Sequence, residues 1–89
     1  MDFKKDLLKK KIIYRATYRG TKEMDKLLGA FVNKYIENLT IDNLLDLEKL
    51  LEIDDNNLYN FYNDIKTDID FNDTYINKLY EIFRYHNNN

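Results

Sequence analysis

The side chains best suited to chemistry gather in one short stretch that reads RGTKEMD. Arg19 carries a planar guanidinium that stays charged and matches a carboxylate or a carbonyl oxygen. Gly20 has no side chain, so a partner surface can approach its backbone closely. Together with Lys22, Glu23 and Asp25 these residues make a compact patch of mixed charge. This pattern favours a protein-contact surface.

The same stretch also has a structural interpretation. Gly20 stands where a residue with positive φ commonly ends one helix. Glu23 and Asp25 would then lie near the positive end of the next helix dipole. An Arg19–Glu23 pair on a continuous helix would add only about 0.2–0.5 kcal/mol. The residues alone leave both interpretations open.

A second acidic pair, Asp54 and Asp55, lies farther along the chain. Either residue can cap a short helix by accepting a hydrogen bond from a free backbone N–H. Either can also contact a partner, and the sequence leaves this alternative open.

The familiar routes to catalysis are missing. The chain has no cysteine, and its only histidine, His86, stands beside the final asparagines, where we expect a solvated side chain. The carboxylates show no metal-ligand spacing, and no GxGxxG segment marks a dinucleotide site. We therefore predict that the protein is not an enzyme, has no catalytic residue, binds no metal and holds no cofactor stably.

Length and composition predict an all-α fold, a compact five-helix bundle. The 89 residues include no proline and only two glycines, which is too little turn chemistry for a β-rich domain. We expect one helical domain over residues 1–86, followed by a disordered polar tail at 87–89.

Helical spacing of apolar residues places the five helices. Three are expected at about 4–18, 21–38 and 41–52. Thr40 is the expected N-cap of the third, Asp54 or Asp55 that of a short fourth, and Asn72 or Asp73 that of the fifth. Gly29 is expected to mark the close approach of a neighbouring helix. The apolar positions expected to face the core include Leu8, Ile12, Ala16, Met24, Leu27, Leu28, Phe31, Val32, Ile41, Leu44, Leu45, Leu47, Leu51, Leu58, Tyr59, Phe61, Tyr62, Tyr75, Ile76, Leu79, Tyr80 and Phe83.

Charge is distributed unevenly along the chain. Residues 1–35 hold ten Lys/Arg and four Asp/Glu, a net +6, whereas residues 36–89 hold four and twelve, a net −8. The first third suits an acidic partner; alternatively, the basic first helix would lie along nucleic-acid phosphates. No run approaches the roughly 20 apolar residues of a membrane span. We predict a cytoplasmic monomer with no nucleic-acid or membrane partner.

Two blocks of the sequence resemble a known family. RGTKEMD is similar to the RGxxE-type signature of the succinate dehydrogenase FAD assembly factors. The segment LLEIDDNNLYNF is similar to a second block of that family, at about the usual interval. The chain departs from the family pattern at Tyr18, Thr21, Ile53, Asn56 and Phe61.

The resemblance implies a helper that is not itself an enzyme. Such factors bind the flavoprotein subunit of succinate dehydrogenase, and in some bacteria that of fumarate reductase, and promote covalent attachment of FAD to the subunit's own histidine. It implies a contact centre at Arg19, Gly20 and Glu23, with Lys22 and Asp25 at its edge and Asp54 and Asp55 as further candidates. If Arg19 lies on the surface, its removal should change stability by no more than about 0.5 kcal/mol. A toxin-neutralising interaction module remains the alternative, beside nucleic-acid binding.

Overall fold

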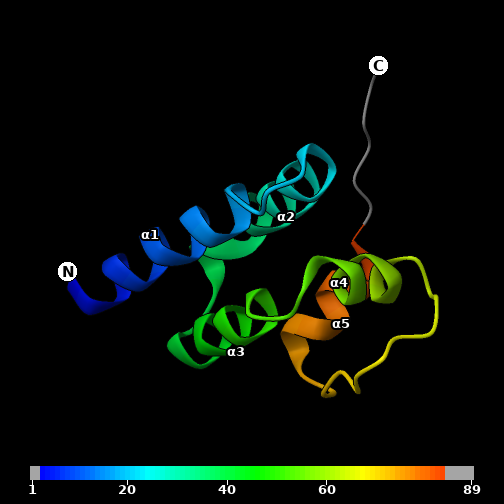
Figure 1. Cartoon of the computed structure of the whole chain (residues 1–89). Coiled ribbons are helices and arrows are strands. Elements are labelled where there is room, and N and C mark those ends of the chain that lie inside the picture. Colours follow the sequence, from blue (N-terminus) through cyan, green and yellow to red (C-terminus); the bar gives the residue numbers. More distant parts are fainter. Residues whose placement is uncertain (1–2, 84–89) are drawn as a thin grey trace.

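The computed structural model describes residues 3–83 (Figure 1). Within this range the chain forms five α-helices, one short 3-10 helix and no strand, which confirms the all-α prediction. The elements are α1 (Phe3–Thr17), α2 (Lys22–Tyr35), η1 (Ile36–Asn38), α3 (Ile41–Leu51), α4 (Asp55–Tyr62) and α5 (Tyr75–Ile82). The expectations for His86 and the tail at 87–89 fall outside the described residues.

The helices pack around one apolar core. A tight turn joins α1 to α2, and α2 runs back along α1 (Figure 1). Helix α3 packs against both α1 and α5, while α4 packs against α5. The fully buried apolar side chains come from all five α-helices and include Ile12, Ala16, Leu28, Leu44, Leu47, Leu58, Ile76 and Tyr80.

Aromatic side chains fix α4 and α5 to the rest of the bundle. The ring of Phe31 in α2 lies 5.3 Å from that of Tyr80 and 5.5 Å from that of Phe83, centroid to centroid. The Tyr80 hydroxyl donates a hydrogen bond of 2.7 Å to the Leu58 carbonyl oxygen in α4. Burial raises the pKa of Tyr80. Tyr80 of α5 therefore contacts both α2, through the Phe31 ring, and α4, through the Leu58 carbonyl.

Short polar side chains cap the starts of α3, α4 and α5, and the predicted cap of α3 is confirmed. The Thr40 hydroxyl accepts from the backbone N–H of Asn43, whose side chain bonds back to Thr40. The fifth helix begins one residue later than predicted: Asn72 and Asp73 are not its cap. The Thr74 hydroxyl accepts from the Asn77 N–H at 3.0 Å instead. The Asn77 side chain donates to the Asn72 carbonyl, so Asn72 serves the turn through its main chain.

Three further expectations about packing are wrong. Ile41 and Leu45 are exposed, because the buried side of α3 is the one that carries Leu44, Leu47 and Leu50. Tyr59 and Tyr75 are also exposed, on the outer sides of the short helices α4 and α5. Gly29 marks no close approach, since a Cβ added there would meet nothing within 4 Å.

Candidate partner-binding site

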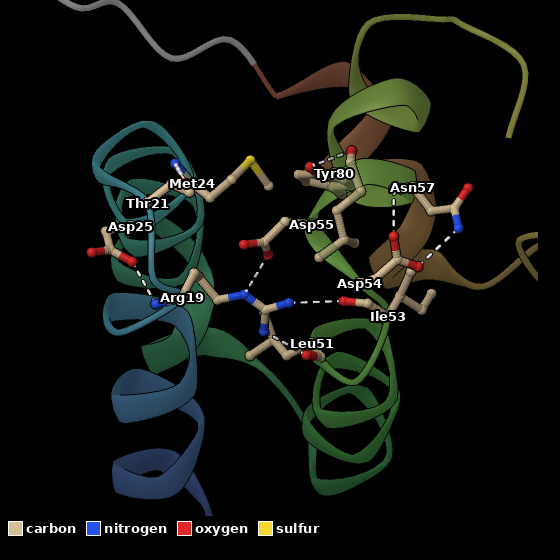
Figure 2. A network of polar contacts seen from close by, with 11 residues as sticks. Arg19, Thr21, Met24, Asp25, Leu51, Ile53, Asp54, Asp55, Asn57 and Tyr80 are labelled. Carbon is tan, nitrogen blue, oxygen red and sulfur yellow. Dashed lines mark hydrogen bonds and ion pairs between the residues drawn. The ribbon is translucent and has the colours of Figure 1, made fainter.

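Arg19 lies in the turn between α1 and α2, and its guanidinium points toward the turn between α3 and α4 (Figure 2). Its Nε donates to Asp55 Oδ1 at 2.8 Å. Nη1 donates to the Leu51 carbonyl at 2.5 Å, and Nη2 donates to the Ile53 carbonyl at 2.8 Å. The Arg19 side chain is only 12% exposed, so these contacts are largely shielded from water. We call Arg19 and its three acceptors the arginine clamp.

The ends of two helices supply two of the three acceptors of the clamp, and Ile53 in the turn between them supplies the third. Leu51 is the last residue of α3, where carbonyl groups have no partner within the helix. Asp55 is the first residue of α4, so its carboxylate faces the positive end of that helix dipole. The ion pair therefore places a cation at the negative end of α3 and an anion at the positive end of α4.

Asp54 has a different role from its neighbour. Its Oδ2 accepts from the backbone N–H of Asn57 at 3.2 Å, and its Oδ1 accepts from the Asn57 side-chain amide at 2.8 Å. These bonds, chiefly the one from the side-chain amide, hold the pKa of Asp54 below its ordinary value. Asn57 also accepts from the backbone N–H of Asp68, which ties the following loop to α4. The capping interpretation is thus confirmed for Asp54.

The turn that carries Arg19 is held by its own residues. The Arg19 backbone N–H donates to Asp25 Oδ1, and the Thr21 hydroxyl accepts from the Met24 N–H at 3.3 Å as the N-cap of α2. Gly20 between them has a φ of +109°, which confirms the expected positive φ. A Cβ at Gly20 would meet nothing within 4 Å, so the backbone conformation alone requires glycine here.

A groove of about 500 Å³ opens between the start of α2 and the end of α4. Glu23, exposed in the first turn of α2, is one of its lining residues. Lys22 and Lys26 supply positive charge from α2, while Tyr59 and Tyr62 supply aromatic surface from α4. Tyr59 is half exposed. The groove thus offers both cationic and apolar contacts beside the exposed Gly20 turn.

The clamp joins two separate blocks of the sequence. RGTKEMD supplies the guanidinium, and residues 51–55 supply all three acceptors. A family model described as "Flavinator of succinate dehydrogenase" matches residues 10–85, which include both blocks. The chain belongs to this family.

Curated relatives of this flavinator-family chain match over shorter stretches. The FAD assembly factor SdhE of Acetobacter pasteurianus is 38% identical over 47 residues, which cover 53% of this chain and 43% of the relative. The mitochondrial succinate dehydrogenase assembly factor 2 of Lodderomyces elongisporus is 33% identical over 54 residues, which cover 61% of this chain and 33% of the relative. The chain therefore spans less than half the length of these curated relatives. No solved structure gives a significant match.

In this member of the flavinator family, the predicted contact residues separate into two groups. Gly20, Lys22 and Glu23 are exposed along one edge and remain candidates for contact. Arg19 faces inward, so the expectation that it lies on the surface is wrong. An Arg19–Glu23 pair required a continuous helix, but α1 ends at Thr17 and α2 begins at Lys22. The ion pair of Arg19 is with Asp55 instead. The Arg19 side chain therefore fixes the turn that carries the exposed edge by binding the turn between α3 and α4.

Asp25, Asp54 and Asp55 are bound into the protein itself. Asp25 accepts from the Arg19 backbone, Asp54 caps α4, and Asp55 pairs with the Arg19 side chain. Their contact with a partner stays a prediction. Asp25 and Asp55 hold Arg19 in the turn beside the exposed edge, and Asp54 holds the start of α4.

Several residues of this region were not predicted from the sequence. Lys26, Tyr59 and Tyr62 line the groove, although their spacing indicated only an ordinary helix surface or core. The exposure of Tyr59 depends on how α4 is rotated on α5, and no local signal gives that. The acceptors at Leu51 and Ile53 are main-chain carbonyl groups. Since every residue has such a group, the residue types at these positions give no signal for the contact.

The residues described by the structure hold neither a metal-ligand cluster nor a membrane-spanning helix. Across residues 3–83 no group of three or more His, Asp or Glu side chains is arranged to hold a metal ion. In the same range no helix is both long and apolar enough to cross a membrane.

Proposed function

We propose that this protein is an assembly factor that binds the flavoprotein subunit of succinate dehydrogenase and promotes the covalent attachment of FAD to it. The observation that carries the proposal is the match of the flavinator family model to residues 10–85. The two relatives, one named as an FAD assembly factor and one as a succinate dehydrogenase assembly factor, support the same function.

The proposed contact surface is the exposed edge at Gly20, Lys22 and Glu23 together with the groove between α2 and α4. Lys22 and Lys26 suit carboxylates of the partner, and Tyr59 suits an apolar side chain. Aromatic side chains at the centre of an interface commonly carry much of the binding free energy. The arginine clamp holds the start of α2 and the start of α4 in fixed relative positions. Both walls of the groove can then contact the partner together.

The proposed mechanism is positioning. The chain contains no thiol. The protein acts by holding the flavoprotein subunit in a conformation in which that subunit's own histidine and the flavin are well oriented. Orientation of this kind removes an entropic part of the barrier without any bond to the helper. On this proposal the protein is not an enzyme, holds no FAD of its own, and acts as a cytoplasmic monomer.

Covalent flavin on the flavoprotein subunit tests the function directly. In-gel flavin fluorescence after denaturation would compare cells with this protein, without it, and with Glu23→Ala. We expect flavin to be lost without the protein and reduced with the variant. If flavin is unchanged in the absence of the protein, the proposed function is wrong.

Affinity measured with the purified flavoprotein subunit tests the surface. If Glu23 is a hot spot, its replacement by alanine should weaken binding by about 2 kcal/mol, or about 30-fold. Lys66→Ala is the matched control, because Lys66 is an exposed charged residue outside this groove. Equal affinity of Glu23→Ala and wild type would show that Glu23 is not part of the contact surface, but it would not contradict the proposed function.

A further inference from the structure

Helix α1 carries a second apolar row on the side that faces solvent. Phe3, Leu7 and Tyr14 are each at least half exposed. At about 100° per residue these three fall within about 40° of one another around the helix axis. Ile12 and Ala16, which are fully buried, lie on the opposite side. The outer row is therefore not a part of the core.

Lysines accompany this outer row. Lys10 borders the row on one side, and Lys4 and Lys11 lie along its other flank; all three are exposed. Lys11 reaches Glu48 of α3 at 2.8 Å, yet its side chain remains 52% exposed. Asp6 is the only acidic residue in the helix. The outward half of α1 thus combines apolar side chains with a net positive charge.

We propose that this outward face of α1 lies on an anionic lipid surface. A helix of this kind rests in the plane of the interface, with its apolar side chains at the headgroup boundary and its lysines near lipid phosphates. A second copy of the chain fits less well, because pairing two such faces brings like charges together. A nucleic acid gives the lysines a partner but leaves the exposed Phe3 and Leu7 without one.

The charge distribution of the whole chain orients it in the same way. Residues 1–35 carry a net +6 and residues 36–89 a net −8. The acidic loop between α4 and α5 and the start of α1 lie at opposite sides of the molecule (Figure 1). An anionic surface would therefore attract α1 and repel that loop. The sequence-based prediction of no membrane partner rested on the missing span, which a surface-lying helix does not need.

The groove is separate from this face, because its lining residues are 22–24, 26, 27, 59, 62 and 63, and none of them belongs to α1. The inference rests on α1 alone and does not depend on the proposed function. Its test therefore uses the isolated protein and lipid vesicles, without the flavoprotein subunit.

A single tryptophan tests the orientation, since the chain contains none. Phe3→Trp places the probe on the proposed face, and Tyr75→Trp places it at an exposed aromatic position of α5. With vesicles that contain phosphatidylglycerol, we expect a blue-shifted emission and quenching by brominated lipid for Phe3→Trp only. With phosphatidylcholine alone we expect neither. Binding without a shift at Phe3→Trp, an equal shift at Tyr75→Trp, or no binding overturns the proposal.

Removal of charge tests the electrostatic part. Each lysine near an anionic membrane strengthens binding about fivefold, so removal of three should weaken vesicle flotation by about 100-fold. The matched control removes three exposed lysines from other elements, and each set includes one ion-paired lysine. The test set is Lys4→Gln, Lys10→Gln and Lys11→Gln; the control set is Lys49→Gln, Lys66→Gln and Lys78→Gln. Equal loss in both sets would show attraction by net charge alone and overturn the proposed face.

A pair of double variants tests the contribution of apolar contact to vesicle binding. Phe3→Ser with Leu7→Ser should weaken flotation, whereas Ile65→Ser with Ile69→Ser, which removes two exposed apolar side chains from the loop after α4, should not. Retention of DNA in place of vesicles, lost steeply with salt, would favour the nucleic-acid interpretation and also overturn the proposal. Circular dichroism of every variant confirms that the fold persists.

Discussion

Replacement of Arg19 by alanine should destabilise the protein by about 3 kcal/mol. The change removes three charge-assisted hydrogen bonds, each of which contributes about 1.5–3 kcal/mol. Their simple sum overstates the effect, because Asp55 is 27% exposed and regains water when its partner is lost. Loss of one member of a buried ion pair costs about 3–5 kcal/mol, and partial exposure places this pair at the lower end. In a domain of this size that corresponds to at least about 12 °C in Tm.

Urea unfolding followed by far-ultraviolet circular dichroism measures this loss. Lys22→Ala is the control in the same stretch, and its exposed side chain predicts a change within about 0.5 kcal/mol. Arg19→Lys keeps the charge, but an ammonium cannot match the fork that reaches three acceptors, so most of the loss should remain. A double-mutant cycle with Asp55→Ala should give a coupling free energy of about 1 kcal/mol or more.

The result that would refute the clamp is specific. If Arg19→Ala unfolds with the same free energy as Lys22→Ala, or if its coupling to Asp55 is near zero, the three contacts do not stabilise the protein. Arg19 would then be available to a partner, as the sequence alone suggested. Affinity for the flavoprotein subunit should be compared only at temperatures where both proteins remain folded.

Further predictions concern the two glycines and the buried tyrosine. Gly20→Ala should destabilise the protein by about 1–3 kcal/mol, because its φ of +109° strains any side chain. Gly29→Ala should instead be neutral or stabilising by up to about 1 kcal/mol, since it lies within a helix and has open space around it; thermal unfolding of the pair checks both. Tyr80→Phe should cost about 1 kcal/mol through the lost bond to the Leu58 carbonyl. Burial raises the pKa of Tyr80, so its contribution to stability is complete below the unfolded pKa of about 10 and decreases as the pH rises above it. Urea unfolding at about pH 9 and about pH 11 should therefore show the difference between wild type and Tyr80→Phe becoming smaller.

Local chemistry made much of the fold predictable. The caps at Thr40 and Asp54 depend on residues three positions away, and the apolar row of α2 repeats at helical spacing. The rotation of a short helix is less predictable. Helix α4 has eight residues, and its packing on α5 decides that Leu58 is buried and Tyr59 exposed.

The sequence did not predict the geometry of the candidate site. Gly20 and Glu23 are exposed, and their contact with a partner stays a prediction. The direction of Arg19 was not predictable, because its ionic partner Asp55 lies 36 positions away in the chain. Its other acceptors are carbonyl groups of the main chain, which carry no residue signature.

The arginine clamp also limits how the exposed edge can be transferred to other molecules. A peptide that copies RGTKEMD would contain the guanidinium but none of the three acceptors. In water its arginine would stay solvated and its glycine would sample many conformations. Grafting the motif onto another helical hairpin would likewise fail unless residues 51–55 came with it. The smallest portable unit is therefore the pair of turns, and inhibitors that mimic this surface need a scaffold that holds both.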